Sequence, residues 1–422
     1  MSKLDELIAE LCPNGVEYKS LGEIATIARG GNFQKKDFCD RGVPCIHYGQ
    51  IYTKYGLFTD KTITFITEER AKKQKFAKTN DIIMAVTSEN IEDVCKCLAW
   101  LGNEDVAVSG HSAIISHNQN PKYLVYYFHS QMFFTQKRKL AHGTKVIEVT
   151  PDTLKSIKLP VPPLEVQREI VHILDSFTLL TAELTAELTA RKKQYEFYRD
   201  NLIKKEQHIS EVKKLADVAN IYDSLHQTPS YSNSGYSMVR VQDIKGGYLD
   251  EDKTLKVDES VWNLFTQKYT PRLNDIVVSR VGSYGNFALI PNDKCCLGQN
   301  VALIHPNINP KYLYHVLMST MTKQWINNNV KGASQKSFSL ADIKRVPVPV
   351  PKENIQQRIA EVLDNFEAIC TDLNIGLPAE IEARQKQYEY YRDLLLTFAE
   401  TGSTLMTDRQ TDRQTDRQTD RQ

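Results

Sequence analysis

The 422-residue sequence lacks several features that mark membrane proteins and enzymes. No apolar run approaches the roughly 20 residues that a membrane-spanning helix needs, and the first residues carry scattered charges without the apolar core of a signal peptide. We therefore expect a cytoplasmic protein without membrane contact. There is no P-loop, no Gly-rich dinucleotide fingerprint and no HExxH or GxSxG motif. The sequence thus shows no catalytic machinery and no cofactor site of its own.

Two further motifs give only weak support for catalysis. NPKY at 120–123 and 309–312 faintly resembles the NPPY pocket of amino-methyltransferases, but its third residue is Lys and no Gly-rich loop precedes it. We interpret both copies as turns that open helices. A nuclease motif at Pro151-Asp152 lacks the second acidic residue with a following Lys.

Charge and cysteine content argue against a protein that binds nucleic acid through a global basic field and against a zinc protein. The formal net charge is only +1, so binding to nucleic acid would have to rest on local patches rather than on a global basic field. The sequence has eight cysteines without a CxxC pair, and the spacing of Cys39, Cys45, His47, Cys95 and Cys97 fits no usual zinc module. We expect free, mostly buried thiols and no metal site.

The most informative feature is a long internal repeat. KQYEFYRDNL at 193–202 and KQYEYYRDLL at 386–395 share eight of ten residues, at an offset of 193. LPVPPLEVQREIVHILDSF at 159–177 corresponds to VPVPKENIQQRIAEVLDNF at 348–366, and NPKYL occurs at 120–124 and at 309–313. Such a repeat predicts two similar structural units related by an approximate two-fold axis. Two similar units suit a ligand that is itself two-fold, such as duplex DNA.

Each half has the same order of segments. A mixed segment of short strands and helices is followed by a Pro-rich arm and then by a long helix. We therefore predict an α+β fold with two mixed domains at 1–158 and 206–346, a central helix at 159–205, a distal helix at 347–400 and a tail at 401–422.

Apolar residues recur in both long helices at spacings of mostly three or four, which is typical of a coiled coil. The alternative is that each helix lies on its own domain. Two equal helices after equivalent domains pack most simply as an antiparallel pair that holds the domains apart.

The repeat is interrupted in one place. Between Phe366 and Ala383 the second half has four extra residues, and Gly376 and Pro378 there should break or kink the distal helix. The first half carries instead TAELTAEL at 181–188, a perfect tandem. One TAEL unit adds about 6 Å of helix, close to two base pairs at about 3.4 Å each. We hypothesise that the number of TAEL units sets the distance between the two ends.

Residue types that bind DNA bases and phosphates cluster in the loops of both mixed segments. Arg, Asn and Gln can bond base edges bidentately, while Lys and Ser mostly hold phosphates. The candidates in the first half are Lys35, Lys36, His47, Tyr48, Gln50, Thr87, Asn90, His111, Lys137, Arg138 and Lys145. Those in the second half are Arg240, Gln242, Arg280, Ser283, Tyr284, Asn286, Gln299, Asn300, Lys331, Gln335 and Lys336. The scaffold segments agree between the halves and these loops differ, as expected of two readers of different sequences.

The two-fold repeat, the Pro-rich arms, the tandem TAEL and the paired KQYE(F/Y)YRD helices together resemble the specificity subunit of type I restriction-modification enzymes, over residues 15–400. The resemblance implies two target-recognition domains that read a bipartite, gapped DNA sequence. It also implies docking of two modification subunits, which use S-adenosylmethionine to methylate adenine, and of ATP- and Mg-dependent restriction subunits. The family pattern of Gly, Gln and a basic residue before the arm matches Gly332, Gln335 and Lys336, whereas Val146 stands at the Gln position in the first half.

The C-terminal tail departs from this resemblance. It contains four copies of TDRQ, whose alternating charges predict disorder. TDRQ can be encoded by three ACAG repeats, and such a tract encodes the same cycle in every frame. We hypothesise that the end of the gene is phase-variable.

Two other function classes stay open at this point. One is a self-contained methyltransferase or nuclease with unrecognised motifs. The other is a coiled-coil scaffold that binds DNA without sequence preference.

Overall fold

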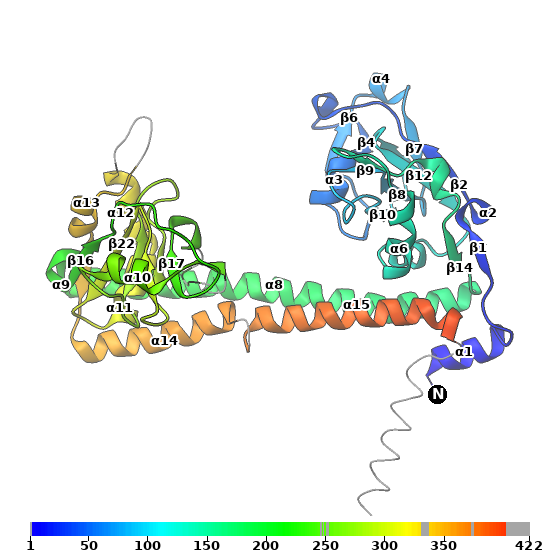
Figure 1. Cartoon of the computed structure of the whole chain (residues 1–422). Helices are drawn as coiled ribbons and strands as arrows, with labels where there is room; N and C mark the ends of the chain where they lie inside the picture. The colour runs from blue at the N-terminus through cyan, green and yellow to red at the C-terminus, as the bar shows by residue number, and fades with distance from the viewer. Residues whose placement is uncertain are drawn as a thin grey trace, which may run out of the picture. The chain divides into compact units, whose positions relative to one another are not determined.

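The computed structural model describes residues 2–244, 247, 249, 253–330, 337–372 and 375–401 (Figure 1). The chain divides into two compact units. Unit 1 comprises residues 1–183 together with 382–422, and unit 2 comprises residues 184–381. Each unit therefore combines one mixed domain with segments of two long helices. Among the described residues, no helix is long and apolar enough to cross a membrane.

Unit 1 contains one mixed domain built on short strands. Its elements are α1 (Lys3–Leu11), β1 (Tyr18–Ser20), α2 (Leu21–Ile24), β2 (Ala25–Arg29), η1 (Lys35–Asp37), β3 (Phe38–Cys39), β4 (Val43–Ile46), α3 (Tyr48–Thr53), β5 (Phe58–Thr59), β6 (Thr64–Ile66), α4 (Glu68–Ala71), β7 (Lys75–Ala77), β8 (Ile82–Ala85), β9 (Thr87–Ser88), β10 (Cys97–Trp100), β11 (Val106–Val108), β12 (Ser112–His117), α5 (Pro121–Phe128), α6 (Gln131–Leu140), β13 (Ile147–Glu148), α7 (Pro151–Leu154) and β14 (Lys158–Pro160).

Among its described residues, unit 2 repeats this plan with fewer strands. Its elements are β15 (Glu211–Lys214), α9 (Leu215–Val218), β16 (Ala219–Asp223), β17 (Tyr236–Val239), η2 (Val241–Asp243), β18 (Leu255–Val257), α10 (Glu259–Thr266), β19 (Ile276–Ser279), β20 (Phe287–Leu289), β21 (Cys295–Leu297), β22 (Val301–Pro306), α11 (Pro310–Met318), α12 (Thr320–Asn329), α13 (Leu340–Arg345), β23 (Pro347–Val350) and α14 (Glu353–Thr371).

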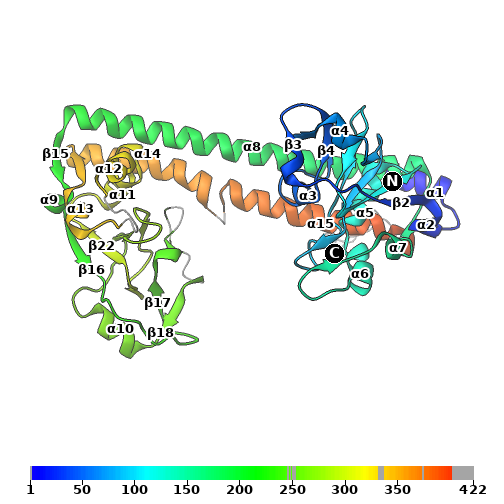
Figure 2. The same ribbon diagram turned by 90° about the horizontal axis from the view of Figure 1, so that it is seen from above.

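Both domains are built on two sheets whose strands correspond in order. In unit 1 the sheets run β2-β12-β8-β10-β5 and β3-β6-β4-β11-β7, and in unit 2 they run β16-β22-β19-β20 and β18-β17-β21. Both domains share an equivalent parallel pair, β4 with β11 and β17 with β21, and unit 1 has a further parallel pair at the end of its other sheet, β5 with β10. Figure 2 shows β17 and β18 of unit 2 and β3 and β4 of unit 1 from above. The inner strands are buried on both faces, which explains their continuous apolar sequences, such as IIMA in β8 and IVVS in β19.

The NPKY segments open helices, as predicted. The Asn120 side chain caps α5 by accepting hydrogen bonds from the backbone N–H groups of Lys122 (3.0 Å) and Tyr123 (3.3 Å). Asn309 caps α11 in the same way, accepting from the N–H of Tyr312 at 2.9 Å. In each helix the proline is the first residue, where its missing N–H costs nothing.

The Pro-rich arms are extended, but they are not free-standing. β14 pairs antiparallel with β1, and β23 pairs with β15, so each arm joins the strand that begins its own domain. Proline cannot donate to a sheet, and it is tolerated in such edge pairs.

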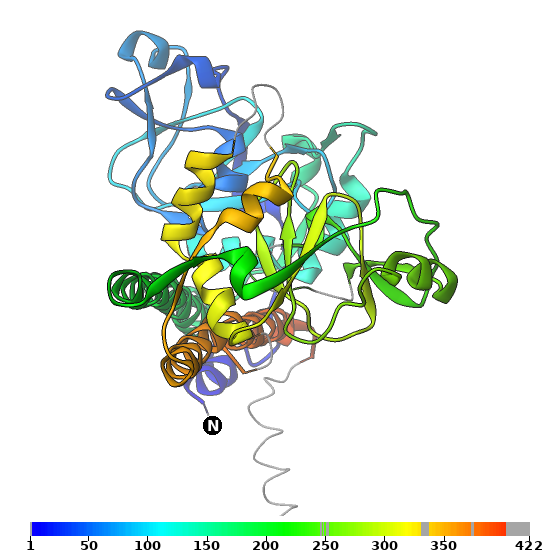
Figure 3. The ribbon, with the colours of Figure 1, turned by 90° about the vertical axis from the view of Figure 1, so that its left-hand side faces the viewer.

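The long helices follow the sequence pattern. The central helix α8 (Leu164–Ile209) contains neither glycine nor proline and runs without a break. The distal segment is divided into α14 and α15 (Leu377–Thr401), as the predicted break at Gly376 and Pro378 requires. In unit 1 the first turns of α8 lie antiparallel beside α15, and in unit 2 its later turns lie beside α14 (Figures 1 and 3). These antiparallel helices and the two mixed domains confirm the predicted fold class.

The eight cysteines are free thiols, as predicted. Seven are buried, and Cys39 is half-buried.

Candidate DNA-recognition surfaces

The same three loops meet in both units. In unit 1 they follow β4, β8 and β11, and in unit 2 they follow β17, β19 and β21. Ser109 N–H donates to the Ile46 carbonyl at 3.1 Å, and Gly298 N–H donates to the Val239 carbonyl at 2.8 Å. These equivalent bonds hold the first and third loops together.

A second equivalent bond fixes the middle loop. Val86 N–H donates to the His111 carbonyl at 2.9 Å, and Arg280 N–H donates to the Asn300 carbonyl at 2.8 Å. The backbone therefore places His47 at the position of Arg240, since both directly follow the parallel strand and cap the next helix. By the same correspondence, His111 occupies the position of Asn300.

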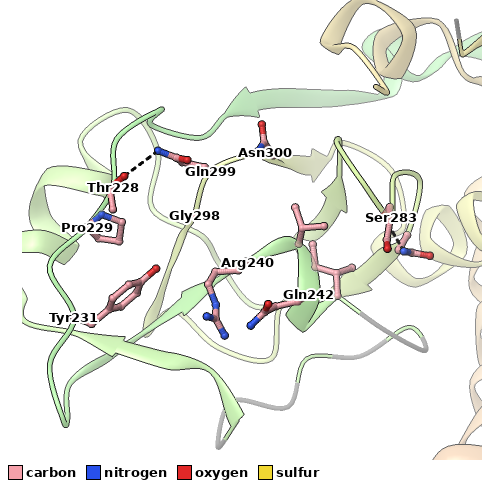
Figure 4. A pocket seen from close by; sticks show the side chains of 12 residues that line it. Thr228, Pro229, Tyr231, Arg240, Gln242, Ser283, Gly298, Gln299 and Asn300 are labelled. Carbon is pink, nitrogen blue, oxygen red and sulfur yellow. Dashed lines mark hydrogen bonds between the residues drawn. The ribbon is translucent and has the colours of Figure 1, made fainter. Parts of the chain in front are cut away.

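In unit 2 these loops surround a pocket of about 530 Å³. Six of the predicted residues line it, namely Arg240, Gln242, Ser283, Asn286, Gln299 and Asn300. Figure 4 shows that Arg240, Gln242, Ser283, Gln299 and Asn300 come from different loops around one opening. Their side chains offer donors and acceptors of the kind that bind base edges. This pocket is the main candidate for DNA recognition in unit 2.

Arg240 is the strongest base-reading candidate in this pocket. Its Nε and Nη2 donate to the two carboxylate oxygens of Asp243 at 3.0 and 3.1 Å. This hydrogen bonding to Asp243 raises the pKa of the Arg240 guanidinium above its ordinary value. The side chain is therefore a permanent cation in a fixed orientation.

The corresponding surface of unit 1 carries aromatic rings where the pocket of unit 2 carries amide side chains. The ring of Tyr48 lies between those of His47 and His111, at centroid distances of 4.5 and 5.0 Å. Thr87 Oγ1 lies 3.2 Å from His111 Nδ1, and the Lys35 side chain lies beside His47 and Gly49. Five of the predicted residues thus come together here: Lys35, His47, Tyr48, Thr87 and His111. His47 and Thr87 are buried beneath the others, while Lys35 and His111 are exposed.

His47 is held in its neutral form. Burial lowers its pKa to about 4, and the charge of Lys35 and the ring of His111 act in the same direction. Its Nδ1 accepts a hydrogen bond from Gly49 N–H at 3.2 Å. A neutral imidazole at this position can offer a hydrogen bond but no charge.

Comparison with known proteins identifies this architecture. The family model of the type I restriction modification DNA specificity domain matches residues 13–191 and again 209–383. The chain belongs to this family. It carries two specificity domains, one for each half of the internal repeat.

Individual relatives agree with the family match. The chain is 36% identical over 258 residues to the EcoR124I/EcoR124II specificity subunit of Escherichia coli, covering 58% of this chain and 63% of that one. The chain is also similar to a solved structure from work on complex assembly and conformational transition of the type I restriction-modification system. The TM-score is 0.57 at 15% identity, and the match covers 91% of this chain and 98% of that chain. The S subunit from M. genitalium has a TM-score of 0.50 at 12% identity, over 91% and 97% of the two chains. These structural likenesses show the fold.

Several predicted residues of the first specificity domain have structural positions instead. Lys137 is buried, and its Nζ donates to the carbonyls of Glu92 (2.9 Å) and Val94 (2.6 Å). Gln50 is also buried, where it accepts from His47 N–H at 3.0 Å and donates to Thr64 at 3.1 Å. The Asn90 amide donates to the Asp93 carboxylate and accepts from the Asp93 backbone N–H. We remove these three from the candidate set because their polar atoms already serve the fold.

Arg280 of the second domain is likewise anchored within the fold. Its guanidinium is paired with Asp223, and Nε donates to the Phe338 carbonyl at 3.4 Å. The equivalent position in the first domain is the buried Val86. Arg280 therefore supports the pocket wall rather than lining the pocket.

The remaining predicted residues lie around these surfaces. Lys36 and Arg138 are exposed, and Lys145 is exposed in the loop before β13, whose partner strand β9 contains Thr87. Tyr284 packs against the core of unit 2. Lys331, Gln335 and Lys336 lie outside the described residues, as does Gly332.

Sequence reasoning missed part of the pocket wall in the second domain. Thr228, Pro229 and Tyr231 line it from the loop between β16 and β17. Their loop reads HQTPSYSNSG, and the signal available was an aromatic residue among small polar ones. Gly298 also lines the pocket, and its φ is ordinary.

One cluster outside the pockets contains groups that can bind metals. His315, Asp364 and Glu367 offer ligand atoms within 4.8 Å of one another. His315 Nε2 lies 2.8 Å from Asp364, which also pairs with Lys311, and Glu367 accepts from the Tyr314 hydroxyl at 2.9 Å. The groups thus satisfy one another, and the cluster joins α11 to α14.

Proposed function

We propose that this chain is the DNA specificity subunit of a type I restriction-modification complex and that it has no catalytic role itself. Each specificity domain reads one half of a bipartite, gapped target. One observation carries the proposal: equivalent backbone positions present different chemistry in the two domains, His47 and His111 in one and Arg240 and Asn300 in the other. Two copies of one frame with different side chains suit two different half-sites.

The partners follow from the duplicated plan. Each unit contains a domain with its own pair of helix segments, so two copies of one partner can dock in equivalent ways. We infer that these are two modification subunits that methylate adenine with S-adenosylmethionine, joined by restriction subunits that use ATP and Mg. This chain would bind double-stranded DNA in the cytoplasm and hold none of these cofactors.

The test is a methylation map by single-molecule sequencing. Cells would express the modification subunit either alone or together with this chain. We expect a new gapped motif, with methyladenine in both halves, only when this chain is present.

Two results would contradict the proposal. An assembled complex that yields no motif would favour a scaffold that binds DNA without sequence preference. Methyl transfer by the purified chain alone with S-adenosylmethionine would favour a self-contained enzyme.

A further inference from the structure

We propose that Arg240 reads a guanine in the half-site bound by the second specificity domain. This inference rests on the proposed function and adds to it the base and the residue. Arginine recognises guanine by donating two parallel hydrogen bonds to O6 and N7 in the major groove. The pocket meets the three requirements of this contact: a fixed guanidinium, a donor edge covered by the exposed side chain of Gln242, and surroundings that do not favour phosphate.

The first requirement is met by Asp243. Its carboxylate accepts from Nε and Nη2 of Arg240, and one of its oxygens also accepts from the Arg240 backbone N–H at 2.9 Å. Only 9% of the Asp243 side chain is exposed. The carboxylate thus holds the Nε–Nη2 edge from within the fold. The Nη1–Nη2 edge of the planar guanidinium remains for a ligand, and the Tyr231 side chain is a further neighbour of this group.

That remaining edge faces Gln242, as Figure 4 shows. With the Gln242 amide turned by 180°, its oxygen accepts from Nη1 at 3.1 Å and from Nη2 at 2.7 Å. Gln242 is exposed, so it can swing away. The Gln242 amide oxygen is a single acceptor shared by Nη1 and Nη2. Guanine O6 and N7 are also acceptors, and they would give each of these two nitrogens an acceptor of its own.

The surroundings favour a base over a phosphate. Among the described residues that line the pocket, Arg240 is the one cation, and its neighbours Ser283, Gln299 and Asn300 are neutral. The adjacent carboxylate of Asp243 offsets the positive charge that a phosphate needs. Phosphate contacts depend on such charge, whereas base contacts depend on oriented donors and acceptors.

The first domain lacks this device. The equivalent residue is His47, whose Nδ1 already accepts from Gly49 N–H. A single imidazole cannot form the two parallel hydrogen bonds that two N–H groups on one edge of a guanidinium can donate. The Arg240 contact is therefore expected in one half-site only.

The experiment uses the complex of this chain with its modification subunits and the motif found by the methylation map. In a set of otherwise identical duplexes, each guanine of the motif would be replaced in turn by 7-deazaguanine, which lacks N7. For one guanine in one half-site, we expect the wild-type complex to bind several-fold more weakly. The complex with Arg240→Ala should not distinguish that duplex from the unmodified one, because alanine has no donor for N7, whereas lysine could still reach it.

Replacing the whole base pair gives a second measure. Exchanging that G·C pair for A·T should weaken wild-type binding by about 5- to 150-fold, the discrimination of one bidentate contact. The methylation map of the Arg240→Ala complex should accept other bases at this position alone. The matched control is Arg345→Ala, since Arg345 also pairs with an aspartate three residues away, Asp342, but lies outside the pocket.

The outcomes separate the two proposals. If the wild-type complex gives no gapped motif, the proposed function fails, and this assignment fails with it. If a motif exists but no guanine depends on N7, the assignment alone is overturned. It is also overturned if the Arg240→Ala complex keeps the wild-type response, or if Arg345→Ala loses discrimination in the same way.

Discussion

Phe177 of α8 stacks on Tyr391 of α15 in unit 1, with 5.3 Å between ring centroids and 20° between ring planes. Unit 2 has the equivalent contact, but there the phenylalanine comes from the second half of the sequence and the tyrosine from the first. There Phe366 of α14 packs on Tyr198 of α8, at 5.6 Å and 36°. Each unit is therefore closed by a helix segment from the other half of the sequence. This explains why the KQYE(F/Y)YRD segments are repeated so closely.

These aromatic pairs predict a unit-specific loss of stability. Phe177→Ala should destabilise unit 1 and Phe366→Ala should destabilise unit 2, each by about 2 kcal/mol, since a half-buried ring and its partner lose their packing. Hydrogen exchange followed by peptide would show which unit opens more readily. Leu179→Ala is the control, because that side chain is 61% exposed on the same helix. Equal loosening of both units by either substitution would contradict the exchange of helix segments.

His47 predicts a pH dependence of stability in the first specificity domain. Its pKa is lowered to about 4 by burial, so between about pH 6.5 and pH 4 the unfolded chain takes up a proton that the folded domain does not. Its contribution is present above about pH 6.5 and is lost as the pH falls toward 4, by on the order of 2 kcal/mol.

The measurement is urea unfolding of the wild type and of His47→Asn at pH 7 and pH 5. Asn can still cap α3, so the variant should lose less stability on acidification. His172→Asn, at an exposed position on α8, should behave like the wild type. A variant that loses as much stability as the wild type would show that His47 already titrates normally.

The tandem TAEL predicts the gap of the DNA target. Inserting a third unit after Leu188 adds about 6 Å of helix, and the methylation map should show a longer gap with both half-sites unchanged. Glu187→Ala, which keeps the length, should leave the gap unchanged. An unchanged gap in the insertion variant would refute the hypothesis.

The TDRQ tail lies outside the described residues, and its prediction concerns the gene. If an ACAG tract encodes it, sequencing many single colonies should reveal different repeat numbers. Mixed codons and a constant length would indicate an expansion at the protein level.

The sequence predicts the scaffold of this protein better than its recognition surfaces. The caps Asn120 and Asn309, the extended arms and the break at Gly376 and Pro378 depend on local chemistry, which a pattern of residues records. The repeat also predicts the antiparallel pairing of the long helices, but not the individual contact between Phe177 and Tyr391, because its register depends on packing between residues far apart in the sequence.

The candidate DNA-binding residues also differ in how far the sequence predicts their role. Arg240, Gln242 and Asn300 could be chosen because their side chains can bond base edges and because they stand in loops at matching places in both halves. Lys137 could not be excluded from the sequence, because only the fold shows that its ammonium group is buried against two carbonyls. A lysine at the end of an amphipathic helix is usually exposed.

The central claim is that two equivalent surfaces read two halves of one target independently. The most direct test compares the methylation maps of His111→Ala and Asn300→Ala, which alter the same backbone position in the two domains. We predict that each variant changes base preference in a different half-site and that the gap stays constant. A change in the same half-site for both variants, or in both half-sites for either one, would contradict the account.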